Sequence, residues 1–149
     1  MSMGALSNAE SYREFRVNDP LMAHATVLLV EDETLLREGI QEVLEISGYR
    51  VIGAADGLEA LEWLAQVPVS LVITDLIMPN MNGVEFIERV REQYPELPII
   101  VASGSTGPTI QRLGLESIEV PGTMASIHKP FKGADMVALV QKVLAVPTV

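Results

Sequence analysis

The chain has 149 residues, of which 48% are hydrophobic and 20% charged, so it is long enough for one compact domain and too apolar to be wholly disordered. Its formal charge of −10 argues against direct binding to DNA or RNA phosphates, and its lack of cysteine excludes disulfides and thiolate metal sites. The longest apolar runs are far shorter than the roughly 18–20 residues that span a bilayer, and the N-terminus does not have the pattern of a secretory signal, so we expect a cytoplasmic single-domain protein.

Residues 1–24 differ from the rest of the chain because they show little hydrophobic periodicity. Ser7 and Glu10 have the spacing of a capping box, which indicates a short helix. A disordered leader, with Met22 as an alternative start, is an equally open interpretation.

Short apolar strands and amphipathic helices alternate from residue 26 onward. The expected strands, which are apolar on both faces, cover residues 27–30, 51–54, 71–74, 99–102 and 124–127. The first helix closes at Gly48, the next two begin after the capping residues Asp56 and Asn82, and the last spans residues 133–145. This alternation predicts an α/β fold in which a five-stranded parallel sheet carries helices on both faces.

The segment 104–122 interrupts the alternation with four glycines and two prolines. Pro108 suits the first turn of a helix, whereas Gly114 within a helix costs about 1 kcal/mol relative to alanine. We expect a short or mobile helix in this segment.

Polar side chains stand at the carboxyl ends of four expected strands. Glu31 and Asp32 follow the first strand, and Asp75, Ser103 and Lys129 follow the third, fourth and fifth. Ligands bind at this edge of an open parallel sheet, and the first and third strands are neighbours in the flavodoxin-like order 2-1-3-4-5. Carboxylates that meet there repel unless a cation lies between them, and Mg²⁺ suits such oxygen ligands while leaving positions for a phosphoryl group.

The same residues have the chemistry of phosphoryl transfer. Asp75 can act as a nucleophile, Lys129 can neutralise a phosphoryl oxygen and Ser103 can donate a hydrogen bond to another. Each of these polar residues also has an ordinary structural interpretation. Acidic side chains are favourable at the start of a helix, and Asp, Ser and Lys are common in exposed loops.

Four motifs together resemble the receiver domain of two-component response regulators. They are VLLVEDE (27–33), VITDLIMPNMNGVEFI (72–87), IIVASG (99–104) and HKPF (128–131). The similarity covers residues 26–145. It implies the flavodoxin-like fold with strand order 2-1-3-4-5, in a receiver domain of residues 25–146 that no effector domain follows.

The resemblance implies a role for each polar residue at the strand ends. Asp75 accepts a phosphoryl group from a histidine kinase or a histidine phosphotransfer protein, and Ser103 and Lys129 hold the phosphoryl oxygens. The Mg²⁺ ligands that it implies are Glu31, Asp32, Asp75 and the backbone carbonyl of Ile77. The protein is then a single-domain response regulator rather than an enzyme with a separate substrate, and its output is binding to another protein.

Two features depart from the receiver pattern. Ser126 stands where most receivers carry a Tyr or Phe that moves inward on phosphorylation, and a serine cannot fill an aromatic slot. The distance along the chain from Ser103 to Lys129 is also longer than usual. We therefore hypothesise that the protein signals through another face or by ordering the segment 104–122 on phosphorylation, which is a recognised mode of switching.

Two alternative functions remain open, and particular residues argue against two others. A phosphorelay shuttle and a degenerate receiver that acts as a scaffold are the nearest alternatives. A phosphatase of the haloacid dehalogenase type needs a second acid where this chain has Ile77, and the acids at 31–33 would repel the phosphate of a flavin. Because Ile77 has no polar group to orient water, we also expect slower self-hydrolysis than in receivers with Asn at this position.

Overall fold

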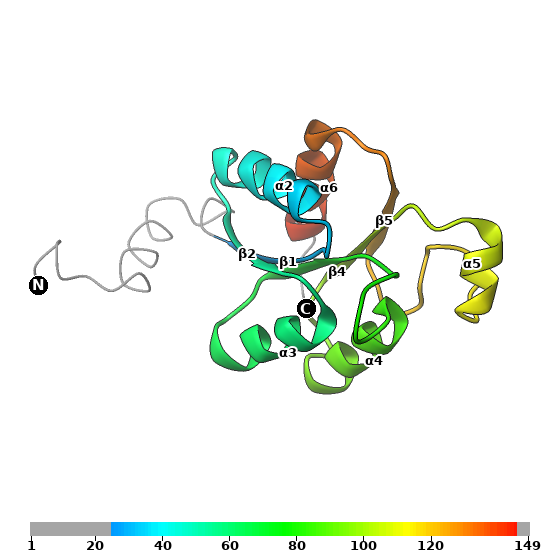
Figure 1. The fold of residues 1–149 in the computed structure, drawn as a ribbon. Coiled ribbons are helices and arrows are strands. Elements are labelled where there is room, and N and C mark those ends of the chain that lie inside the picture. Colours follow the sequence, from blue (N-terminus) through cyan, green and yellow to red (C-terminus); the bar gives the residue numbers. More distant parts are fainter. Residues whose placement is uncertain (1–24, 146–149) are drawn as a thin grey trace, which may run out of the picture.

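Five parallel strands form the centre of the computed structural model, which describes residues 25–145 (Figure 1). Their order across the sheet is β2-β1-β3-β4-β5, which confirms the predicted flavodoxin-like α/β fold. The expected helix or leader of residues 1–24 lies outside the described residues. In chain order the elements are β1 (Thr26–Val30), α2 (Thr34–Ile46), β2 (Arg50–Ala54), α3 (Gly57–Gln66), β3 (Leu71–Thr74), α4 (Gly83–Gln93), β4 (Ile99–Ser103), α5 (Gly107–Arg112), β5 (Ala125–His128) and α6 (Gly133–Ala145).

The sheet separates two hydrophobic cores because successive side chains of a strand point to opposite faces. Val27 and Leu29 of β1 pack with buried residues of α2 and α6 on one face, and Leu28 and Val30 pack with α3 and α4 on the other. Figure 1 shows these two helix layers above and below the sheet. Burial of each such side chain contributes on the order of 1.5–3 kcal/mol.

The helix ends follow the expected capping chemistry. The side chain of Asp56 accepts a hydrogen bond from the backbone N–H of Glu59 at 2.8 Å, and that of Asn82 accepts one from Glu85 at 2.9 Å. Gly48 follows α2 with a φ of 100°, a conformation that favours glycine.

The expected fifth strand is displaced by one residue. We expected residues 124–127, but β5 spans Ala125–His128 and the side chain of Met124 is exposed. The backbone N–H of Met124 still donates to the carbonyl of Ile99 at 2.9 Å, so this residue joins the loop to the sheet edge without forming part of the strand.

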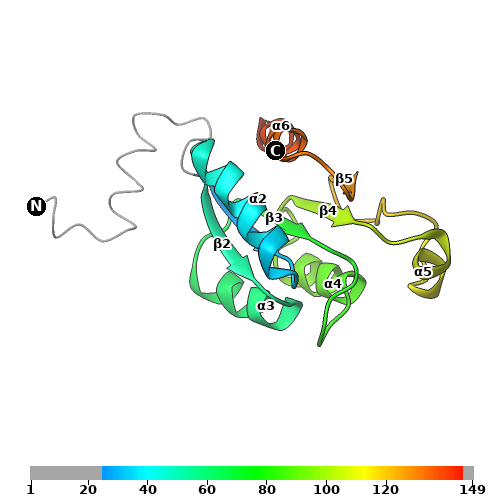
Figure 2. The ribbon, with the colours of Figure 1, turned by 45° about the horizontal axis from the view of Figure 1, so that its top comes forward.

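The segment 104–122 contains the expected short helix, α5, with Pro108 in its first turn. The chain leaves α5 through Gly114, which has a φ of 79°. Buried Ile118 and Val120 then pack into the core under α4, and Arg91 of α4 donates to the carbonyl of Gly122. Figures 1 and 2 both place α5 at the β5 edge, outside the two helix layers.

Candidate functional site

The carboxyl ends of β1, β3, β4 and β5 bring the expected site residues to one edge of the sheet. Val30 is the register partner of Thr74, so Glu31 and Asp75 leave neighbouring strands side by side. Ser103 is the register partner of His128, which places Lys129 beside the end of β4. The peptide bond from Lys129 to Pro130 is cis.

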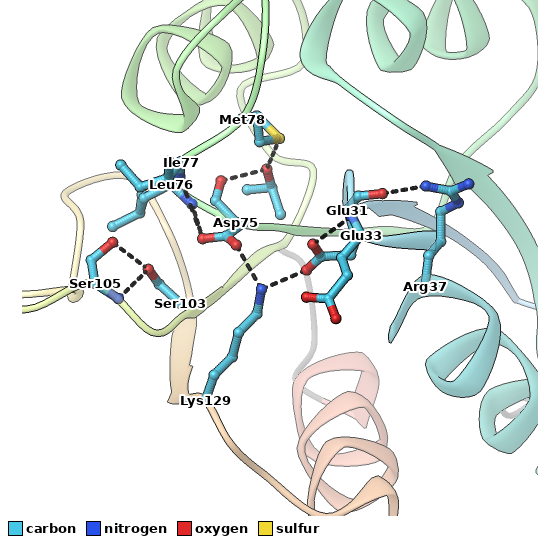
Figure 3. Close-up of polar contacts among 11 residues, drawn as sticks. Glu31, Glu33, Arg37, Asp75, Leu76, Ile77, Met78, Ser103, Ser105 and Lys129 are labelled. Carbon is cyan, nitrogen blue, oxygen red and sulfur yellow. Dashed lines mark hydrogen bonds and ion pairs between the residues drawn. The ribbon is translucent and has the colours of Figure 1, made fainter. Parts of the chain in front are cut away.

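Lys129 joins the two acidic strand ends (Figure 3). Its Nζ donates to Oε1 of Glu31 and to Oδ2 of Asp75, each at 2.6 Å. The side chains are 18% exposed for Lys129, 4% for Glu31 and 10% for Asp75, so all three charges are largely removed from water. One ammonium between two carboxylates leaves this cluster with an excess of negative charge.

The pKa values of Lys129 and Glu31 respond to this burial in different ways. Burial disfavours the charged form of Lys129, but its hydrogen bonds to Asp75 and Glu31 outweigh that effect and raise the pKa of the ammonium. Burial raises the pKa of the Glu31 carboxyl, although the hydrogen bond from Lys129 opposes the shift. Lys129 therefore stays protonated at neutral pH and can attract an anion.

The loop after β3 fixes the carboxylate of Asp75. Its Oδ1 accepts a hydrogen bond from the backbone N–H of Leu76 at 2.6 Å and faces that of Ile77 at 3.4 Å. Gly83 closes this loop, because its N–H donates to the carbonyl of Leu76 at 2.8 Å. A Cβ at Gly83 would collide with the carbonyl oxygen of Asp75 and lie 2.6 Å from Cα of Leu76, so only glycine allows this approach.

Ser103 is fully buried and is the last residue of β4 rather than the first residue after it. Its hydroxyl donates to the hydroxyl oxygen of Ser105 at 2.9 Å, and the backbone N–H of Ser105 donates to Ser103 at 3.2 Å. The backbone carbonyl of Ser103 accepts a hydrogen bond from the N–H of Lys129 at 3.0 Å. Within residues 25–145 its hydroxyl makes no hydrogen bond to Asp75 or Lys129, so this group lies beside the ion-paired cluster and not in it.

The donor set at these strand ends fits a hard cation. Asp32 is exposed and its carboxylate has no hydrogen-bond or ion-pair partner among the described residues, while Glu31 and Asp75 converge on one ammonium. Oxygen ligands of this kind are those that Mg²⁺ takes, together with water. In the described part of the chain, no three acidic, histidine or cysteine side chains are arranged as a finished metal site.

Two residues near the site were missed in the sequence. Arg37 of α2 donates to the backbone carbonyl of Glu31 at 2.6 Å and packs along Gly53, so it supports the turn after β1. Nothing in its sequence context marks it. Ser105 has a local signal, because a serine two residues after another can form a hydrogen-bonded turn with it.

A pocket of about 630 Å³ opens beside Asp75 and Lys129. It is also lined by the loop after β4 and by α5, including Ser105, Thr109 and Arg112. A group attached to Asp75 would therefore have space at the edge of the sheet.

Residues 27–141 match the family model of the response regulator receiver domain. The response regulator Rre1 of Synechocystis is 37% identical over 125 residues, which cover 80% of this chain and 52% of that protein. The response regulator receiver protein CpdR of Brucella abortus is 32% identical over 118 residues, which cover 79% of this chain and 95% of that protein. The chain thus spans about half the length of some curated relatives and nearly all of another.

The fold also matches solved structures. The chemotaxis protein CheY4 of Vibrio cholerae superimposes with a TM-score of 0.69 at 32% identity, and the match covers 80% of this chain and 98% of that one. No helix within residues 25–145 is both long and apolar enough to cross a membrane.

Proposed function

Because this chain belongs to the response regulator receiver domain family, we propose that it acts as a response regulator that accepts a phosphoryl group on Asp75. The observation that carries the proposal is the position of Lys129, whose ammonium lies 2.6 Å from a carboxylate oxygen of both Asp75 and Glu31. A cation held at this point can neutralise the charge that a phosphoryl group brings.

The donor in this proposal is the phosphohistidine of a histidine kinase or of a histidine phosphotransfer protein. A carboxylate oxygen of Asp75 attacks phosphorus, the P–N bond breaks, and the histidine nitrogen keeps the electron pair and takes a proton from water. The N–H groups of Leu76 and Ile77 hold the carboxylate in place. The product is an aspartyl phosphate, and the chain acts on no separate substrate.

The residues that would hold Mg²⁺ are Glu31, Asp32, Asp75 and the carbonyl of Ile77. Bound there, the ion supplies positive charge for the transferring phosphoryl oxygens. Lys129 and the hydroxyl of Ser103 would hold the remaining oxygens. To do so, Lys129 would give up one of its hydrogen bonds to Glu31 and Asp75 and bind a phosphoryl oxygen instead. Ser103 would likewise replace its hydrogen bond to Ser105 by one to a phosphoryl oxygen.

The output in this proposal is binding to another protein. Ser126 is half-buried on β5, opposite Val101, and has no ring that could move inward. The neighbouring segment 104–122, with its short helix α5, is therefore the surface that we expect to respond to phosphorylation.

The test is incubation with acetyl phosphate and Mg²⁺ followed by intact-mass measurement. The wild type should gain the mass of one phosphoryl group, and Asp75→Asn should not. Asp135→Asn, an exposed acid in the first turn of α6, is the matched control and should behave as the wild type. Equal modification of Asp75→Asn and the wild type would overturn the assignment of the acceptor.

Label transfer separates a terminal regulator from a phosphorelay shuttle. Phosphorylated protein would be mixed with histidine phosphotransfer domains, and the label on the histidine domain would be followed. Retention of the label on this chain supports the terminal regulator, whereas rapid transfer supports the shuttle.

A further inference from the structure

A basic side chain lines the same pocket as the phosphoacceptor. Asp75 and Lys129, at the ends of β3 and β5, border this pocket of about 630 Å³ together with Thr109 and Arg112 of α5. An anion attached to Asp75 enters the same space that Arg112 borders.

Arg112 is available for a new partner. It is exposed, and its Nη2 donates to the hydroxyl oxygen of Thr109 at 3.1 Å. Among the described residues no carboxylate lies within ion-pair distance of it, whereas the exposed Arg89 pairs with Glu85 at 3.2 Å. A protein with a formal charge of −10 thus leaves the charge of this arginine unpaired in the pocket that Asp75 and Lys129 border.

We propose that Arg112 binds the phosphoryl group on Asp75, as a second cationic side chain in addition to Lys129. The inference rests on the proposed function, since it requires a phosphoryl group at Asp75. A phosphoryl group on Asp75 carries a charge of about −1.5 to −2, and together with Glu31 and Asp32 it exceeds the combined positive charge of Lys129 and a bound Mg²⁺. The planar guanidinium can give two parallel hydrogen bonds to phosphoryl oxygens.

The attachment of α5 allows this contact to act as a signal. Ile110 is the buried residue of this six-residue helix. Gly107 begins the helix and Gly114 follows it, and an added Cβ at either glycine would have nothing within 4 Å. A bond from Arg112 to the phosphoryl group would draw α5 toward the ends of β3 and β5. Phosphorylation would then order α5 without the aromatic residue that Ser126 replaces.

Beryllofluoride with Mg²⁺, a phosphoryl mimic, tests the proposal on the full chain by isothermal titration. Because a hydrogen bond to a charged group contributes at least roughly tenfold to a binding constant, Arg112→Gln should weaken binding by about tenfold. Arg112→Lys keeps the charge but cannot give two parallel hydrogen bonds, so its affinity should lie between those of the wild type and Arg112→Gln. Arg89→Gln is the matched control, an exposed helical arginine outside the pocket, and should bind as the wild type.

Two further readouts distinguish this role from a merely structural one. Without the mimic, Arg112→Gln and the wild type should unfold at the same temperature. Beryllofluoride should slow hydrogen exchange of residues 107–113 in the wild type and much less in Arg112→Gln. Equal binding and equal protection in both proteins would overturn the inference while leaving Asp75 as the acceptor, whereas a wild type that gains no phosphoryl mass from acetyl phosphate would overturn the proposed function itself.

Discussion

The hydroxyl of Ser103 donates its hydrogen bond to Ser105 at 2.9 Å and accepts one from the backbone N–H of Ser105 at 3.2 Å. A serine hydroxyl has a single proton to donate. The Ser103 hydroxyl therefore cannot donate a hydrogen bond to Ser105 and to a phosphoryl oxygen at the same time. The resting hydrogen bond competes with the bond that phosphorylation would require.

Ser105→Ala should remove this competition and strengthen binding of beryllofluoride with Mg²⁺. The expected gain is about two- to tenfold, the range of one net hydrogen bond. Isothermal titration measures it, and the same substitution in a Ser103→Ala background should have no effect. If Ser105→Ala acts equally in both backgrounds, Ser105 does not act through Ser103.

Lys129→Met should destabilise the fold, because Glu31 and Asp75 would then share a buried edge without a cation. Loss of one partner from a buried pair costs about 3–5 kcal/mol, and the 18% exposure of Lys129 reduces our expectation to about 2 kcal/mol. Urea unfolding at neutral pH measures the change. Mg²⁺ should stabilise this variant more than the wild type.

Lys142→Met is the control for that experiment, since Lys142 is exposed in the last turn of α6. Its free energy of unfolding should stay within about 0.5 kcal/mol of the wild type. If Lys129→Met is equally stable, the two carboxylates do not depend on the ammonium.

The fold could be predicted because each local signal agreed with the whole. Strand β3 is buried on both faces, as its unbroken apolar run required, and Asp56 and Asn82 cap their helices. The predicted start of β5 was wrong by one residue, because apolar Met124 extends the apolar pattern of the strand although its side chain is exposed. Hydrophobicity alone cannot distinguish the last loop residue from the first residue of an edge strand.

The site was predictable only in part. Glu31, Asp75 and Lys129 could be brought together from the strand order, because the ends of parallel strands share one edge. The place of Arg112 depends on how far α5 stands from the sheet, and the long irregular segment around it determines that. No periodic pattern in the sequence encodes such a distance.

Ile77→Asn should hasten the loss of the phosphoryl group from Asp75. The side chain of Ile77 is 47% exposed and borders the pocket, where an amide could orient an attacking water. We expect hydrolysis to become several-fold faster, with little change in stability because the position is half exposed. Decay of the phosphorylated mass after removal of the donor measures the rate. Ile77→Val is the apolar control and should decay as the wild type.

The cap of α3 should make stability depend on pH in the acid range. The hydrogen bond from the N–H of Glu59 lowers the pKa of the Asp56 carboxyl below its ordinary value of 3.8, and the amide of Asn80 assists. A lowered folded-state pKa means that this stabilisation is complete above about pH 4 and is lost as pH falls through the folded value. Because Asp56 lies near the surface, the effect is small.

Asp56→Asn tests this, since asparagine keeps the capping oxygen without the ionisation. Its free energy of unfolding should fall less than that of the wild type between pH 5 and pH 2.5. Asp56→Ala, which removes the cap, should cost about 1 kcal/mol near pH 7. Identical acid profiles for the wild type and Asp56→Asn would show that the cap does not titrate in this range.

Gly83→Ala should disturb the phosphoacceptor loop itself. The added methyl group would meet the backbone of Asp75 and Leu76, which cannot move aside as a flexible side chain can. We expect a loss of about 1–3 kcal/mol in stability, together with slower phosphorylation by acetyl phosphate as Asp75 shifts. Gly39→Ala is the matched control, because an added Cβ there has nothing within 4 Å and alanine favours α2 by up to about 1 kcal/mol. If Gly83→Ala keeps wild-type stability and phosphorylation rate, the close approach at Gly83 does not position Asp75.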